Sequence, residues 1–557
     1  MKTLRRLRPA IWALGTAAVV SLGASSIAAT AVSTPAEAPR GKVHRLTSTQ
    51  YAAVIADLFG ANINIGGRFE PDQRVDGLIA VGSGQVSVSS AGLDQYDSMA
   101  RSISSQVLSA QNRKAVMPCT PASEKAPDDA CAAKFLAKTG NALFRRPLTD
   151  AELKAQVLAA NQAGVKAGDF YTGLSLSLAS LLVSPEFLFR VEEVQPDPAV
   201  AGGFRLNAMS KAQRLSFFLW NAVPDRELVT AAEKGELDTP RGLAKQVDRM
   251  LASPRLEEGV RAFFDDMLRL DGMESVVKDT TIFPKFDSQI ATEAREQTLR
   301  TIISVVLAPK GDYRDIFSTK KTFMTPKLAS IYKVQFSNDV PIGAPDSWQP
   351  YEFAADDPRA GILMQTAFLT MNSHPGRTSA TLRGKALREV MMCQIVPAPP
   401  ANVEFKIVQD TSNPDYKTAR ARLTAHSSSP ACAGCHKIVD PMGLALENFD
   451  GGGAFRTNEN GAALDTTGEL DRIKFTNGAE LGRAVRENPA TSACLVQRLS
   501  AYGLGQSPTK EQTAWVNALK ETFAKDGYNV PALMRRLATS PEFYRAVPAG
   551  EKTTAAH

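Results

Sequence analysis

Histidine and cysteine are scarce in this chain, whose 557 residues contain five histidines and six cysteines. With so few histidines, no Ser/His/Asp catalytic triad can be assigned from the sequence. No cysteine precedes Cys119, which excludes a lipoprotein anchor at the N-terminus. Only four tryptophans are present, and no aromatic platform for sugars is visible.

Excess charge of one sign and long apolar runs are also missing. The net charge of +6 is small for this length, and part of it lies in the first eight residues, so we expect no nucleic-acid partner. After the N-terminal segment no stretch approaches the roughly 20 apolar residues that span a membrane. We therefore expect no transmembrane segment in the mature protein.

The N-terminus has the layout of a secretory signal peptide. A basic start from Lys2 to Arg8 precedes an apolar stretch at 11–22, and Ala29-Thr30-Ala31 offers a cleavage site. The alternative is a membrane anchor, which the short, Ala- and Gly-rich apolar run disfavours. We expect cleavage after 1–31 and a periplasmic or secreted protein.

Six cysteines in an oxidising compartment suggest pairing. Cys119 and Cys131 bracket a loop that contains proline and aspartate, and they could close it. Cys393 and Cys494 either pair across a long span or remain two buried thiols.

The other two cysteines belong to Cys432-Ala433-Gly434-Cys435-His436, a CxxCH pattern. Each thiol can add across one haem vinyl group, and the adjacent histidine then faces the iron. We predict one covalent haem c on Cys432 and Cys435, with His436 as the proximal iron ligand. A zinc site would need a second cysteine pair at finger spacing, and a redox dithiol would need a βαβ context; the sequence has neither.

Candidates for the sixth iron ligand are few. His426 and His374 lie well inside the chain, and Met442 ranks below them because the chain would have to round the haem edge through Pro441. Met371, Met391 and Met392 remain possible, and a vacant or water-bound position is a further alternative.

The patterns predict a mainly α protein, a multidomain helical array with a C-terminal cytochrome c-like haem module. Capping boxes at Thr47–Gln50 and Thr149–Glu152 open helices. Residues 61–95 are predicted to be loop, 168–192 a long apolar helix, and Ser210 a helix cap. The expected units are a signal peptide at 1–31, an N-terminal helical domain at 42–118, a helical domain at 119–200, a central helical domain at 201–335, a haem c-motif domain at 360–475, which ends in turns with a small hairpin at 451–475, and a C-terminal helical domain at 476–546.

Several motifs occur together along nearly all of the mature chain. They are Leu46 to Gly60, Leu143 to Thr149, Leu215 to Trp220 with Pro224-Asp225, Arg377 to Ser379 with Arg383-Gly384, His426 with Cys432 to His436 and Leu446 to Asp450, and Cys494 to Gly505 with Ser540 to Phe543. The set resembles a family of multidomain exported proteins, planctomycete-type and cytochrome c-like, that is catalogued as consecutive domains of unknown function. The resemblance implies a mainly helical array with a cytochrome-like module and no settled reaction. Arg377 and Arg383 could pair with haem propionates.

Three functions remain open at this point. The favoured one is electron transfer to or from a partner oxidoreductase, through a redox partner protein. The second is a haem-dependent oxidase or peroxidase acting on an extracytoplasmic substrate; it would need an open sixth position, and dihaem peroxidases need two CxxCH motifs where this chain has one. The third is a cell-surface binding or scaffold protein, since fold alone does not decide function.

Overall fold

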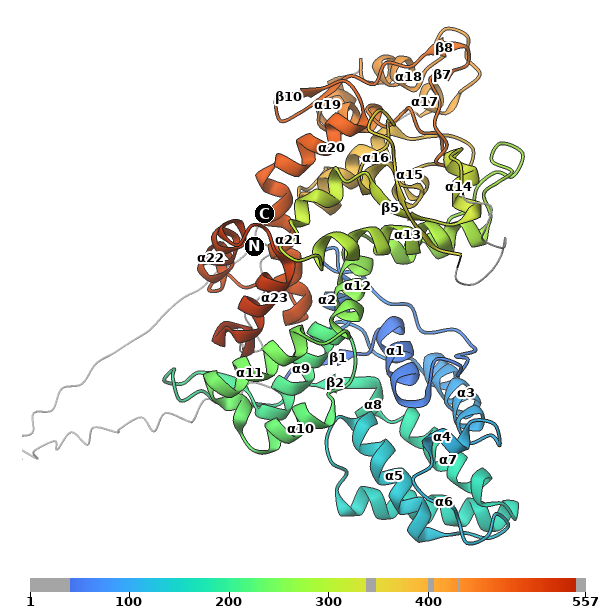
Figure 1. Cartoon of the computed structure of the whole chain (residues 1–557), viewed down its shortest axis with the longest axis vertical. Helices are drawn as coiled ribbons and strands as arrows, with labels where there is room; N and C mark the ends of the chain where they lie inside the picture. The colour runs from blue at the N-terminus through green and yellow to red at the C-terminus, as the bar shows by residue number, and fades with distance from the viewer. Residues whose placement is uncertain (1–40, 337–346, 399–404, 429, 547–557) are drawn as a thin grey trace, which may run out of the picture. The chain divides into compact units, whose positions relative to one another are not determined.

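The computed structural model describes residues 41–336, 347–398, 405–428 and 430–546, and Figure 1 labels its helices and strands. The expected signal peptide at 1–31 lies outside the described residues. Within them the chain is mostly α-helical, and its strands form only two- and three-stranded pieces. The predicted mainly α, multidomain fold class is confirmed. No helix among the described residues is long and apolar enough to cross a membrane.

The N-terminal region is built on α1 (Ser48–Phe59), α2 (Ile79–Gly82), α3 (Ser90–Val107) and α4 (Arg113–Val116). The predicted capping box is present: the N–H of Gln50 donates to Thr47 Oγ1 at 3.1 Å, and the N–H of Thr47 donates to Gln50 Oε1 at 3.3 Å. The predicted loop at 61–95 is wrong where α2 and α3 form. The polar, serine-rich sequence of α3 conceals a buried face that includes Tyr96 and Ile103.

The next region is a helical hairpin with flanking short elements. It contains α5 (Asp129–Phe144), α6 (Asp150–Ala167), α7 (Phe170–Leu182), α8 (Pro185–Leu188) and β2 (Phe189–Val191), which pairs antiparallel with β1 (Val43–Arg45). The capping box of Thr149 and Glu152 is present. The predicted apolar helix at 168–192 is too long. It ends at Leu182 because Pro185 has no backbone N–H to continue it and begins a new helix instead.

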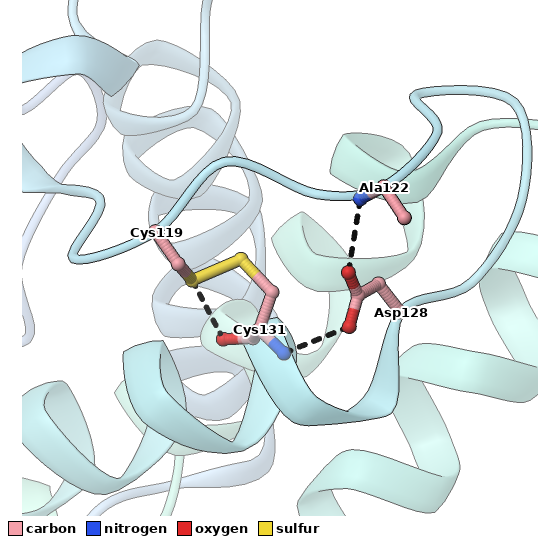
Figure 2. Close-up of a disulfide and its surroundings, with 4 residues drawn as sticks. All are labelled: Cys119, Ala122, Asp128 and Cys131. Carbon is pink, nitrogen blue, oxygen red and sulfur yellow. Dashed lines mark hydrogen bonds between the residues drawn. A yellow bond between two sulfur atoms is a disulfide. The ribbon is translucent and has the colours of Figure 1, made fainter.

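A disulfide joins Cys119 to Cys131 at the start of α5 (Figure 2). Asp128 caps the same helix: its Oδ1 accepts from the N–H of Cys131 at 2.9 Å, and its Oδ2 accepts from the N–H of Ala122 at 3.0 Å. The predicted closure of the loop between Cys119 and Cys131 is confirmed, and a helix cap fixes the loop together with the covalent bond.

Among the described residues, the central region consists of helices and four short strands. Its elements are β3 (Val194–Pro196), β4 (Phe204–Leu206), α9 (Ala208–Trp220), α10 (Arg226–Glu233), α11 (Pro240–Leu251), α12 (Leu256–Met267), α13 (Ser288–Val306), β5 (Lys321–Met324), α14 (Pro326–Tyr332) and β6 (Gln349–Glu352). Asn207, not Ser210, caps α9, because Asn207 Oδ1 accepts from the N–H of Ser210 at 2.8 Å. Both residues are good cap formers, and the sequence did not distinguish them.

The C-terminal region holds the CxxCH motif and the closing helices. Its elements are α15 (Thr366–Met371), α16 (Ala380–Ala386), α17 (Lys406–Gln409), α18 (Ala419–His426), α19 (Pro430–Leu444), β7 (Asn458–Glu459), β8 (Ala462–Ala463), β9 (Gly468–Leu470), β10 (Ile473–Phe475), α20 (Gly478–Glu487), α21 (Pro489–Leu504), α22 (Thr513–Lys525), α23 (Val530–Thr539) and β11 (Arg545–Ala546). The predicted turns at 451–475 contain two small antiparallel pairs, β7 with β8 and β9 with β10.

Helices α16 and α19 are in backbone contact. A Cβ on Gly384 would lie 1.9 Å from the carbonyl oxygen of Val439, and a Cβ on Gly443 would lie 1.7 Å from that of Ala380. Neither position has room for a side chain, so the two helices approach as closely as backbones can. This contact fixes the position of α19 on α16.

Two large hydrophobic clusters, a small satellite cluster between α16, α18 and α19, and a second disulfide hold the regions. One large cluster joins the central and C-terminal regions, and a second cluster serves the N-terminal helices. Cys393 and Cys494 form a disulfide that ties the chain after α16 to α21. The haem-motif region therefore shares its core with the rest of the C-terminal half.

Candidate haem attachment site

The CxxCH motif lies in the first turns of α19. Cys432 and Cys435 are free thiols and half-buried, whereas the four other cysteines form the two disulfides. Side chains three residues apart on a helix lie on the same face. A Cβ built on Gly434 meets nothing within 4 Å, so the space beside the motif is open. The start of α19 thus presents two free thiols beside open space.

The ring of His436 is held by its own helix. Its Nδ1 lies 2.8 Å from Oδ2 of Asp440, one turn later, and Thr381 Oγ1 on α16 donates to the other oxygen of Asp440 at 2.8 Å. The hydrogen bond to Asp440 raises the pKa of His436, while burial opposes that rise. Because this bond keeps a proton on Nδ1, Nε2 is left as the nitrogen that can bind a metal.

The structure brings His426 against His436. The two ring centroids lie 4.9 Å apart in an edge-to-face arrangement, and the His426 ring also stacks on Phe405 at 6.1 Å. Burial lowers the pKa of His426, and His436 lowers it further, which favours the neutral, ligating imidazole. Since the rings touch, a porphyrin between them would require them to separate.

His374 and Met442 lie elsewhere. His374 is in the turn between α15 and α16, where its N–H donates to the carbonyl of Arg377 at 3.0 Å, and burial lowers its pKa. Met442 is fully buried in the large core cluster. Six residues after His436 on the same helix, it points about 120° away from His436 around the axis. Among the described residues, His426 is thus the one sixth-ligand candidate in ring contact with His436.

The two arginines considered for haem propionates differ. Arg383 is completely buried, and its Nη1 donates to the carbonyls of Leu446 and Phe449, both at 2.8 Å. It fastens the chain that follows α19, so its expected role with a propionate is wrong. Arg377 is half-buried, and within the described residues its guanidinium makes one long hydrogen bond, to the carbonyl of Thr378 at 3.5 Å. It is free to pair with an anion.

The donor set suits a c-type haem. Two thiols and an oriented imidazole are the groups that such a haem takes from its protein, because the porphyrin itself supplies the four equatorial nitrogens. Phe405 beside His426 is 45% exposed, and Ile438, two residues after His436, is 40% exposed. Covering such apolar surface with a flat apolar ring is favourable.

Sequence reasoning missed the groups that orient His436. The four-residue spacing to Asp440 was a usable signal, because positions four apart on a helix are neighbours. Thr381 gave no such signal, since 59 residues separate it from Asp440. Phe405 lies on a short segment whose contact with α18 depends on tertiary packing.

Comparison with known families identifies five domains in order along the chain. They are described as proteins of unknown function and match residues 44–109 (DUF1587), 131–192 (DUF1595), 206–334 (DUF1592), 359–459 (DUF1588) and 471–543 (DUF1585). The CxxCH motif falls inside the DUF1588 match. No curated protein and no solved structure matches the chain.

Proposed function

We propose that this chain, which carries five consecutive domains of the planctomycete cytochrome c-like family, is an exported protein that holds one covalent haem and exchanges electrons with a partner oxidoreductase. The observation that carries the proposal is the state of the cysteines. Four of them form disulfides, and the two that remain free stand beside an oriented histidine.

Each residue of the site has a defined task. Cys432 and Cys435 form the thioether links, and Nε2 of His436 binds the iron. Asp440 holds the proton on Nδ1 and fixes the ring plane. When bound, the haem supplies a centre that takes up and releases one electron at a time. Among the sixth-ligand candidates, the ring contact with His436 favours His426.

Two further observations support export. The basic and apolar N-terminal pattern is that of a signal peptide, and two disulfides are expected in an oxidising compartment.

The test is a pyridine haemochrome assay on protein exported from a host that matures c-type haem. We expect one covalent haem per chain, and its loss in Cys432→Ala and in Cys435→Ala. The double variant Cys119→Ser with Cys131→Ser is the matched control and should keep its haem. Absence of covalent haem from the unmodified protein would overturn the proposal.

The native spectrum then distinguishes a carrier from an enzyme. A six-coordinate iron that does not bind carbon monoxide or peroxide supports electron transfer. An open iron that reacts with peroxide would instead favour the haem-dependent oxidase or peroxidase.

A further inference from the structure

A polar cavity lies outside the haem-motif domain. It measures about 240 Å³ and is walled by the start of α1, by α2, α12 and α13, and by Tyr502 of α21. A neighbouring groove of about 360 Å³ shares Thr49, Asn221, Ala262, Asp265 and Arg295 with it. Together they fall in the size range of small-molecule sites, and three of the family domains contribute to them.

The charges that line the cavity are already paired. Asp265 accepts from Nε and Nη2 of Arg295, both at 2.7 Å, and Arg295 Nη1 donates to Glu274 at 2.8 Å. Asp266 accepts from Arg74 at 2.6 Å and from the N–H groups of two residues of α2 at 2.8 and 3.0 Å. An incoming cation would compete with these arginines, and an incoming anion would meet several carboxylates.

Two neutral polar groups in the wall lack partners. Asn221 is 8% exposed, and its Oδ1 is buried with no hydrogen bond among the described residues. Tyr502 is half-buried, and its hydroxyl makes no hydrogen bond within that part of the chain. Buried polar groups are nearly always paired, so the Asn221 amide calls for a partner that the described residues do not supply, and the half-buried Tyr502 hydroxyl on the same wall can bond to that partner.

The residue type at position 221 has a separate explanation. Asn221 ends α9 with φ of 51°, a left-handed conformation that asparagine tolerates. The conformation accounts for an asparagine there, but it does not account for an amide without a partner in a cavity wall. Tyr502 needs no such conformation, and its ring is already placed by packing on Phe263 at 5.4 Å.

We propose that this cavity binds a neutral, hydroxyl-rich ligand, a saccharide. An amide and a phenol both donate and accept hydrogen bonds, as sugar hydroxyls do, and carboxylates that are held by arginines still have lone pairs for further donors. The site lies in other domains than the haem motif and goes beyond the electron-transfer function.

The probe is an array of neutral oligosaccharides of glucose, xylose, mannose and N-acetylglucosamine, screened with the full exported protein. Titration calorimetry with the strongest binder then measures Kd. We expect Tyr502→Phe and Asn221→Gly each to weaken binding about five- to tenfold, the effect of one lost hydrogen bond. Glycine keeps the left-handed backbone and removes only the amide.

The controls are Tyr351→Phe and Asn460→Gly; Asn460 has φ of 50° and lies in the haem-motif domain. Both should bind as the unmodified protein does. No binding to any neutral oligosaccharide, stabilisation by calcium chloride alone, or binding that neither cavity variant weakens would overturn the proposal. Because Cys432→Ala should bind the same oligosaccharide, failure of haem attachment and failure of this site are separate results.

Discussion

The two sides of the candidate haem site are held very differently. On the His436 side, α19 lies in backbone contact with α16, and buried Asp440 links the ring to Thr381. On the His426 side, α18 itself is tied by the buried Arg422–Glu459 ion pair at 2.6 Å, but among the described residues the His426 ring makes no hydrogen bond and is held by its stack on half-exposed Phe405. A site built this way has one ligand fixed in advance and an opposite wall that can yield to a flat cofactor.

The largest expected effect on stability comes from the disulfide between Cys393 and Cys494. Replacing Cys393 and Cys494 by serine should lower the free energy of unfolding by about 4–5 kcal/mol, because the bond closes a loop with a sequence separation of 101. The same change at Cys119 and Cys131, with a separation of 12, should cost about 3 kcal/mol. Urea unfolding measures both, and equal losses would mean that loop length does not govern the difference.

The next prediction compares two glycines of α19. Gly443→Ala should destabilise the protein by about 1–3 kcal/mol, because the new methyl group would overlap the carbonyl of Ala380. Gly434→Ala, beside the thiols, has open space around it and should stabilise the helix by about 1 kcal/mol. Urea unfolding of the two variants provides the measurement. If Gly443→Ala were neutral, the rigid contact of α16 with α19 would not hold in solution.

The sequence predicted the fold class and the local motifs better than the tertiary contacts, and the haem chemistry of the site stays a prediction. The CxxCH spacing and the capping boxes act over a few residues, so local pattern is enough to find them. The break at Leu182 comes from a single proline, Pro185, within an otherwise continuous helical pattern. The interior role of Arg383 could not be foreseen, because its carbonyl partners follow α19, more than 60 residues later.

A smaller effect is expected from the residues that orient His436. Asp440→Asn should keep the thioether-linked haem and raise its reduction potential, because a neutral amide stabilises the oxidised iron and the imidazole less than a carboxylate does. Thr381→Val should lower the potential slightly, because the Asp440 carboxylate loses a hydrogen-bond donor and becomes a stronger acceptor for His436. Spectroelectrochemical titration measures both shifts. An unchanged potential in Asp440→Asn would show that the 2.8 Å contact is lost when haem binds.

The smallest effect on stability is expected on the His426 side, where the spectrum of the haem is the decisive measurement. His426→Ala should lower the free energy of unfolding by about 1 kcal/mol, because the buried ring loses its packing on His436 and Phe405. If α18 turns this ring to the iron, the ferric spectrum should change from six-coordinate to five-coordinate in that variant and remain unchanged in the control His374→Ala. If only His374→Ala changed the spectrum, the sixth ligand would be His374. Its turn is held by Lys278, whose ammonium donates to the carbonyls of Thr370 at 2.8 Å and His374 at 3.2 Å. Both sides of the haem would then be rigid, and the contrast between them would fail.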